Sequence, residues 1–261
     1  LEVEQGRILL AIDALDSDGN GRDELLPTCR TSDYKIASYA LEWDGAKFVK
    51  LQDLPGWFLR VVANPKTGRR TLYGQRTGMQ DLFGYPAYVL ARVGGEYTPQ
   101  GPVAMPRGAN VFGFAHADVT GDGAEDFVCF NREDYLQLYD AAGREEWTSG
   151  ERYGGKYEYL MTEEEYTLHN RESRAQRDPV PDDPQFIPQR VLLTDFDRDG
   201  KTEVFVVQND DATGRLLTRV RAFRQGHFEA LKWDNVGLTP IWRTRHFAGL
   251  ISDYYVGDVD N

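Results

Sequence analysis

The sequence predicts an all-β protein: a β-propeller, or a contiguous part of one, built from four-stranded blades with Asp-rich loops. Three observations predict this fold class. An acidic nine-residue loop occurs three times, short apolar runs flank each copy, and turn dipeptides mark further hairpins. Repetition of strand, loop and strand at this scale is typical of propellers, in which each repeat is one blade.

The three acidic loops share one pattern. Oxygen-bearing side chains occupy positions 1, 3 and 5, glycine is sixth and a carboxylate is ninth. We call these the first loop (16–24), the second loop (118–126) and the third loop (195–203). A terminal copy opens with Asp258 and Asp260 and the sequence ends one residue later, so we expect this loop to continue in a longer chain.

Apolar runs on both sides of the loops predict strands, because they are short, rich in β-branched or aromatic residues and bounded by turn residues. Before the loops they occupy residues 8–12, 111–115, 191–193 and 254–256, and after the loops 25–26, 127–130 and 204–207. Turn-type dipeptides predict hairpin tips at 44–45, 94–95, 142–143 and 154–155.

The interval between the first and second loops contains a degenerate copy. Residues 57–63 are predicted as a strand, and the following loop (64–70, the degenerate loop) carries Lys66, Arg69 and Arg70 in place of carboxylates. We therefore expect no ion there.

The repeats divide one partial propeller domain that covers residues 1–261. They are predicted at about 1–52, 53–100, 101–150 and 189–247, with 248–261 as the start of the next. The stretch 151–188 is rich in proline and charge, which predicts a surface excursion between repeats, with one helical turn near 162–169.

The loop pattern suits Ca²⁺. This hard cation takes about six to eight oxygen ligands in a flexible geometry, and alternating oxygen side chains wrap around one point. Glycine at position 6 permits the sharp turn, and position 7 supplies a backbone carbonyl, so its side chain (Arg22, Ala124 or Lys201) is free to vary. An EF-hand opens in the same way but needs a glutamate at position 12 between helices. Position 12 holds proline, cysteine or valine here, which excludes the helical version.

The pattern Asp-x-Asp/Asn-x-Asp-Gly-x-x-Asp/Glu between short strands resembles the FG-GAP/VCBS repeats, including those of integrin α-subunit propellers. The resemblance implies a propeller in which each loop joins two blade strands and binds a structural Ca²⁺. Carried across by position, it implies these side-chain ligands: Asp16, Asp18, Asn20 and Glu24; Asp118, Thr120, Asp122 and Asp126; Asp195, Asp197, Asp199 and Glu203. Thr120 and Asn20 are not carboxylates, so we expect the third loop to bind Ca²⁺ tightest. The residues at position 7, together with Asp258 and Asp260, complete the predicted metal sites.

Composition excludes some function classes. Asp and Glu number 42 against 30 Lys and Arg, giving a formal net charge of −12, which argues against nucleic acid as a partner. No apolar run has the length of a transmembrane helix. Cys29 and Cys129 lie beside apolar strands and are expected to be buried free thiols. The four histidines show no local metal-site spacing.

Together these observations predict a non-catalytic, calcium-stabilised module for protein or glycan interaction, in a secreted, periplasmic or surface-attached protein. Extracellular calcium modules bind in the range of about 10⁻⁴–10⁻³ M, which fits that location. We expect the Glu163–Glu165 run to be a solvated face and most of the five tryptophans to pack between blades, with a sugar platform of one or two exposed rings as the alternative. The alternatives are a structural subunit of an extracellular assembly and a polysaccharide-degrading propeller enzyme.

Overall fold

The computed structural model of the chain describes residues 6–78, 81–172, 184–213 and 220–256. Within the described residues, strands account for 55% and helix for 4%, and the strands form small antiparallel sheets. The predicted fold class, an all-β propeller or a contiguous part of one, is confirmed. The chain divides into two compact units, the first comprising Leu1–Val61, Arg70–Ala104 and Leu160–Gln185, and the second Val62–Arg69, Met105–Tyr159 and Phe186–Asn261.

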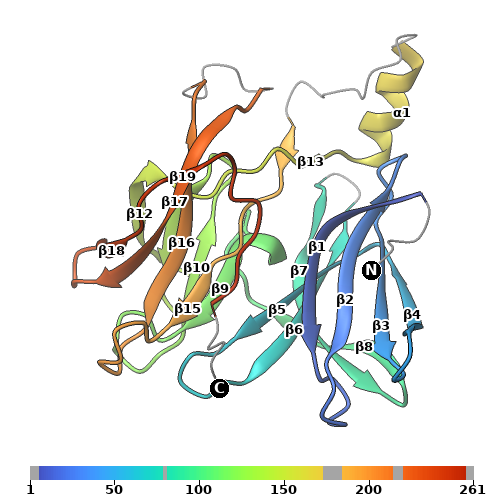
Figure 1. The fold of residues 1–261 in the computed structure, drawn as a ribbon, viewed down its shortest axis with the longest axis horizontal. Helices are drawn as coiled ribbons and strands as arrows, with labels where there is room; N and C mark the ends of the chain where they lie inside the picture. The colour runs from blue at the N-terminus through green and yellow to red at the C-terminus, as the bar shows by residue number, and fades with distance from the viewer. Residues whose placement is uncertain (1–5, 79–80, 173–183, 214–219, 257–261) are drawn as a thin grey trace. The chain divides into compact units, whose positions relative to one another are not determined.

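Unit 1 contains two four-stranded antiparallel sheets, each with its strands in chain order (Figure 1). The first sheet consists of β1 (Arg7–Leu15), β2 (Glu24–Thr31), β3 (Ala37–Trp43) and β4 (Phe48–Pro55). The second consists of β5 (Trp57–Ala63), β6 (Arg70–Thr77), β7 (Phe83–Val93) and β8 (Glu96–Val103). Buried side chains of both sheets form one apolar cluster that includes Leu26, Trp57, Leu72 and Leu90. The meander order and this shared core are those of propeller blades.

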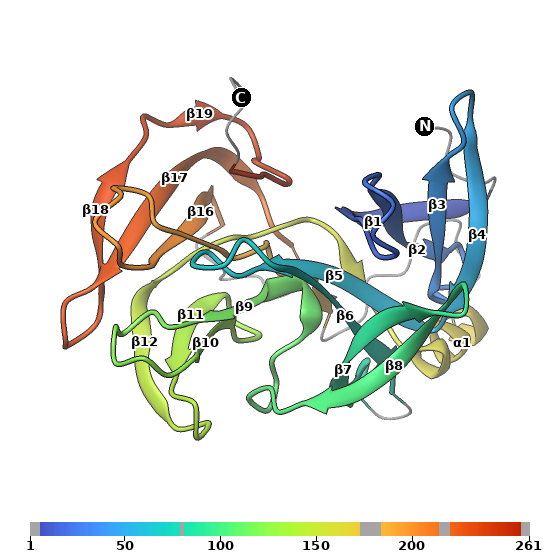
Figure 2. The same ribbon diagram turned by 90° about the horizontal axis from the view of Figure 1, so that it is seen from below.

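Unit 2 repeats the same design (Figure 2). One sheet consists of β9 (Phe114–Ala117), β10 (Asp126–Phe130), β11 (Tyr135–Tyr139) and β12 (Glu145–Arg152). The other consists of β15 (Leu192–Thr194), β16 (Glu203–Asp211), β17 (Phe223–Trp233) and β18 (Leu238–Arg243), and a short strand, β19 (Phe247–Ala248), also pairs with β17.

Each acidic loop occupies the same place in its sheet, between the first and second strands. The first loop joins β1 to β2, the second joins β9 to β10, and the third joins β15 to β16. The degenerate loop holds the equivalent place between β5 and β6. The ninth-position carboxylate is the first residue of the second strand in all three acidic loops. The loops are therefore equivalent parts of equivalent sheets.

Three local predictions are wrong. Residues Val111–Gly113 form a 3₁₀ turn, capped by the Asn110 side chain, and the strand begins only at Phe114. Residues 254–256 belong to no strand, because the Tyr254 ring is buried in the apolar cluster of unit 2 and its hydroxyl donates to the carbonyl of Phe205 at 3.1 Å. The pair Gly154 and Gly155 is not a hairpin tip: Gly154 is buried and forms a parallel bridge to Gln208 on β16.

The stretch predicted as a surface excursion is buried at both ends. Residues 153–156 and 187–190 are buried, and a short pair of strands, β13 (Tyr159–Leu160) with β14 (Gln185–Phe186), lies between them. The expected helical turn is a helix of 10 residues, α1 (Glu163–Glu172). Its start is fixed by a capping box, in which Thr162 and Glu165 each accept the other's backbone N–H. Within the described residues, no helix has the length and apolarity needed to cross a bilayer.

Candidate metal centres

The carboxylate at position 1 organises the turn of each loop. Asp16 accepts the backbone N–H groups of Gly19 at 2.8 Å and Gly21 at 2.9 Å. Asp118 accepts those of Gly121 and Gly123 at 2.7 and 3.2 Å, and Asp195 accepts that of Gly200 at 3.0 Å. In all three loops the backbone therefore turns around the position-1 carboxylate, which accepts its N–H groups.

The glycine at position 6 is required by its backbone conformation. Its φ is +82° at Gly21, +93° at Gly123 and +86° at Gly200, in the left-handed region that side chains with a Cβ resist. The position-5 side chain accepts the backbone N–H of position 7 in each loop, at 2.8, 2.8 and 3.0 Å. The position-7 side chains take no part in this turn, in keeping with their free variation.

The carboxylate at position 9 holds the start of each loop by accepting the backbone N–H group of position 2. One oxygen of Glu24 accepts the N–H of Ser17 at 2.8 Å, and one oxygen of Glu203 accepts that of Phe196 at 2.7 Å. Asp126 accepts two backbone N–H groups, those of Val119 and Thr120, at 2.9 and 2.8 Å. All three acids are at most 1% exposed. Burial is also the main reason why the pKa of Asp126 is raised.

Two of the loops gather three carboxylates around one point. In the first loop Asp16, Asp18 and Glu24 each offer one oxygen within 4.8 Å of the others, and in the third loop Asp195, Asp197 and Asp199 do the same. In the third loop Oδ1 of Asp195 is buried and has no hydrogen-bond partner among the described residues. A buried acceptor without a donor is costly, and a cation between these carboxylates would satisfy it. The donor set, all oxygen, fits a hard cation such as Ca²⁺.

A lysine from a neighbouring strand contacts the third loop. Lys232 Nζ on β17 lies 2.9 Å from Asp197, 2.6 Å from Asp199 and 3.1 Å from Glu203. Its hydrogen bonds with Asp197 and Asp199 raise the pKa of Lys232, and the same contact is the main reason why the pKa of Asp199 is lowered. This ammonium group neutralises the carboxylates from within the chain.

An arginine has the same role in the first loop. Arg92 Nη1 lies 2.7 Å from Asp18 and 3.1 Å from the buried Glu24. Arg70, at the end of the degenerate loop, binds Asp23 through two nitrogens, each at 2.6 Å. The pKa of Asp23 is lowered chiefly by this hydrogen-bonded arginine. Asn20, at position 5, donates from its amide to Glu42 at 2.8 Å.

The second loop receives its cation from the degenerate loop. Lys66 Nζ lies 2.6 Å from Asp118 Oδ2, and Asn64 donates to Glu125 at 3.4 Å. Burial opposes ionisation of Asp118, but the Lys66 ammonium and the amides of Gly121 and Gly123 outweigh it, so the pKa of Asp118 is lowered. The degenerate loop, which lacks carboxylates, thus supplies a positive charge to the second loop.

The remaining predicted metal residues are placed as follows. The side chains of Arg22 and Lys201 are exposed and that of Ala124 is half-buried. Asp258 and Asp260 lie outside the described residues. The two cysteines are free and buried, and burial raises the pKa of Cys129 to about 12.

Sequence reasoning missed the contacts of Arg92, Lys66 and Lys232 with the acidic loops, because strand pairing and sheet packing, not local spacing, bring them there.

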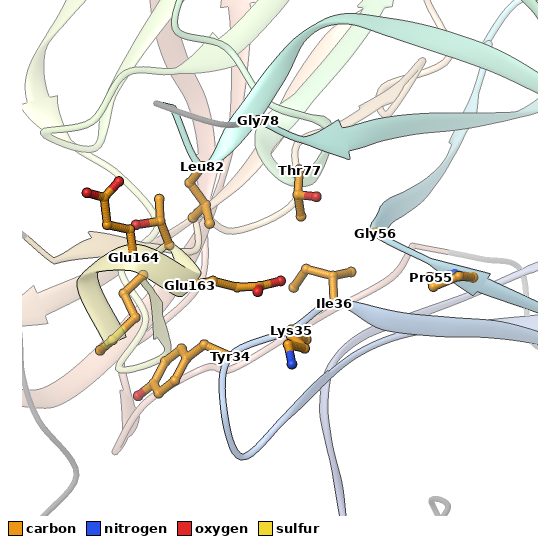
Figure 3. A pocket seen from close by; sticks show the side chains of 12 residues that line it. Tyr34, Lys35, Ile36, Pro55, Gly56, Thr77, Gly78, Leu82, Glu163 and Glu164 are labelled. Atoms are coloured by element: carbon orange, nitrogen blue, oxygen red, sulfur yellow. The ribbon is translucent and has the colours of Figure 1, made fainter. Parts of the chain in front are cut away.

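A pocket of about 520 Å³ lies elsewhere in unit 1, at the start of α1. In Figure 3 the Glu163 carboxylate points into it, toward Ile36 and Thr77, whereas the Glu164 carboxylate points away. Glycoside hydrolysis usually employs two facing carboxylates about 5–9.5 Å apart. Of the two adjacent glutamates at the start of α1, only Glu163 points its carboxylate into the pocket.

No protein-family model matches the sequence, and no curated protein matches it significantly. The three acidic loops are therefore the features of this chain that bear most directly on its function.

Proposed function

We propose that this chain is a non-catalytic, calcium-stabilised repeat module that presents a rigid β-surface to a protein or glycan partner. The observation that carries the proposal is the convergence of three carboxylates on one point in the first and third loops. Like charges at that distance repel, and a bound cation would relieve the repulsion that Arg92 and Lys232 already reduce. The resemblance of the loops to FG-GAP/VCBS repeats points to the same ion and the same structural role.

The expected location follows from the chemistry of the ion. A site of oxygen ligands on a surface loop suits the roughly 10⁻⁴–10⁻³ M affinities of extracellular calcium modules. A secreted, periplasmic or surface-attached protein meets such concentrations. In that setting each ion would tie the first two strands of its sheet together, since the ligands begin after one strand and end in the next.

An exposed aromatic hairpin offers a surface for a partner. Trp43 and Phe48 flank the tip between β3 and β4, are 42% and 40% exposed, and pack edge to face with ring centroids 5.1 Å apart. Val49, beside them, is also exposed. Apolar rings displayed in this way are suited to the faces of sugar rings or to an apolar partner side chain.

The proposal is tested by binding of the calcium-loaded chain to an array of glycans and extracellular proteins. We expect Trp43→Ala to weaken binding at least tenfold, because it removes the larger ring. Tyr85→Ala is the matched control, since Tyr85 is a 65% exposed ring elsewhere in unit 1. Equal loss with both variants would contradict a role for this hairpin.

A catalytic role is the alternative, and the pocket beside α1 is the observation in its favour. Incubation with the polysaccharides that bind should then release new reducing ends, and Glu163→Gln should abolish their release. We expect no release. Chromatographic size as a function of concentration separates a monomeric binder from a subunit of an assembly.

A further inference from the structure

Two histidines and an aspartate meet around β17 in the sheet β15–β18, at the end of β16 that is remote from the third loop. Asp210, His227 and His246 each offer one ligand atom, and these atoms lie within 4.8 Å of one another. The two imidazole rings are 4.5 Å apart between centroids, and His246 Nε2 is 3.7 Å from Asp210 Oδ2. All three residues belong to unit 2.

Strand register explains why residues so distant in sequence come together. Gln208 on β16 pairs with His227 on β17, so Asp210, two residues on, is a diagonal neighbour on the same face. On the other edge of β17, Gly226 pairs with Phe247 of β19, which brings His246 opposite His227. The strand β17, which carries His227, therefore lies between the strand of Asp210 and the segment of His246.

The hydrogen bonding of His227 leaves one ring nitrogen to bind a metal. His227 is 3% exposed, and its Nε2 lies 2.9 Å from an oxygen of Glu229, which is 1% exposed. When the Glu229 carboxylate accepts this hydrogen bond, Nε2 carries the proton, and in that neutral tautomer Nδ1 keeps its lone pair. Nδ1 is buried and has no hydrogen-bond partner among the described residues.

Glu229 is itself firmly held. Arg243 Nη2 lies 2.8 Å from the oxygen that faces His227, and the Tyr153 hydroxyl donates to the other oxygen at 3.1 Å. A carboxylate that receives the other ring N–H of a histidine is the usual support of a metal-binding imidazole, since it fixes the tautomer and the ring orientation.

The segment that carries His246 is also fixed. Thr244 and Phe228 exchange two hydrogen bonds, each 3.0 Å long, one of them through the Thr244 hydroxyl. Asp210 is oriented by Gln225, whose amide donates to Oδ2 at 2.7 Å. Two imidazoles and one carboxylate are thus placed before any ion arrives.

We infer that Asp210, His227 and His246 form a site for a divalent transition-metal ion, Zn²⁺ in the first instance. Zinc takes nitrogen and oxygen ligands in tetrahedral geometry, and three protein ligands leave the fourth position for water. Imidazole ligands select such ions over Ca²⁺ and Mg²⁺, which prefer oxygen. The ion would link β16, β17 and the segment before β19.

The test is a calorimetric titration of the whole chain with Zn²⁺ in a large excess of Ca²⁺, which keeps the acidic loops occupied or screened. We expect one zinc ion per chain. His246→Ala and Asp210→Asn should each weaken binding at least tenfold and leave the fold intact, because both side chains are more than 40% exposed. Glu229→Gln should weaken it by about 10–100-fold, since it removes the support of His227.

His116→Ala is the matched control, because His116 also contacts a carboxylate, Glu125, at 3.2 Å but lies outside the cluster. It should bind zinc as the unaltered chain does. Substitution with Co²⁺ gives a second readout, a visible absorption band that His246→Ala abolishes. Absence of zinc binding by the unaltered chain, or equal affinity in His246→Ala, would overturn the inference.

Discussion

The second and third loops share one backbone design and belong to the same unit, yet their charges are balanced in different ways. The third loop is neutralised from within its own sheet, by Lys232 of β17, which contacts three carboxylates. The second loop is neutralised from outside, by Lys66 of the degenerate loop, which contacts one. In the second loop position 3 is a threonine, whereas the third loop has a further carboxylate, Asp197, at that position.

The difference shows that a calcium-type loop consists of two separable parts. The side chains at positions 1, 5 and 9 build the turn, because each accepts at least one backbone N–H group in both loops. The counter-charge is supplied independently, by Lys66 in the second loop and by Lys232 in the third. A tethered ammonium group occupies the space that an ion needs, so lysine and Ca²⁺ should compete for the same carboxylates.

The largest effect is expected from the ninth-position acids. In excess chelator, Asp126→Ala leaves two backbone N–H groups without their acceptor and should cost about 2–4 kcal/mol in the free energy of unfolding. Glu203→Ala leaves one such group, that of Phe196, and should cost about 1–2 kcal/mol. Urea denaturation measures both. A larger loss for Glu203→Ala would show that the two loops are not built alike.

The next largest effect is expected when a predicted calcium ligand at position 3 is removed. A site with a Kd of about 10⁻⁵ M in about 1 mM Ca²⁺ would add about 2.7 kcal/mol to the free energy of unfolding. Asp197→Ala removes a carboxylate of the third loop and should lose most of that loop's contribution. Thr120→Ala, at the same position of the second loop, should lose less. Melting curves of both variants, recorded with and without EGTA, measure how much calcium-dependent stabilisation each one loses.

Removal of the tethered lysine should strengthen calcium binding. Lys232→Met keeps the apolar stem, removes the competing charge from the third loop, and should raise the calcium affinity of that loop by up to about tenfold, in line with a partly exposed ion pair. The variant should melt lower than the unaltered chain in EGTA, because its carboxylates then repel one another. Unchanged affinity would mean that lysine and ion do not share a site.

The smallest effect is expected at the degenerate loop. Lys66→Ala should raise the calcium affinity of the second loop by about two- to fivefold, since it breaks a single, half-exposed contact with Asp118. Arg69→Ala in the same loop is the control and should change nothing, because its side chain is exposed. An equal effect of both would point to general charge and not to the Asp118 contact.

Much of this arrangement could be predicted from local sequence. The alternation of oxygen side chains and the glycine at position 6 are short-range signals, and the strands around them are short apolar runs of ordinary type. For that reason the loops and the strands that begin at Glu24, Asp126 and Glu203 could be located without a structure.

The partners of the loops could not be predicted, because they depend on register and packing. Arg92 is 74 residues from Asp18, and Lys66 is 52 residues from Asp118. His227 and His246 meet only through the pairing of β17 with β19. Tyr254 follows an apolar pattern that predicts a strand, but its burial in the core of unit 2 determines its conformation instead.

The most direct test of the central claim measures bound metal and thermal stability on the same sample. The chain is dialysed against Ca²⁺, its metal content is measured by mass spectrometry, and its melting temperature is recorded before and after EGTA. We expect bound calcium, a melting temperature that falls by several degrees on chelation, and recovery with Ca²⁺ but not with equal Mg²⁺, which demands a tighter octahedral geometry. No bound metal and an unchanged melting temperature would contradict the account and would mean that Arg92, Lys66 and Lys232 alone hold the acidic loops.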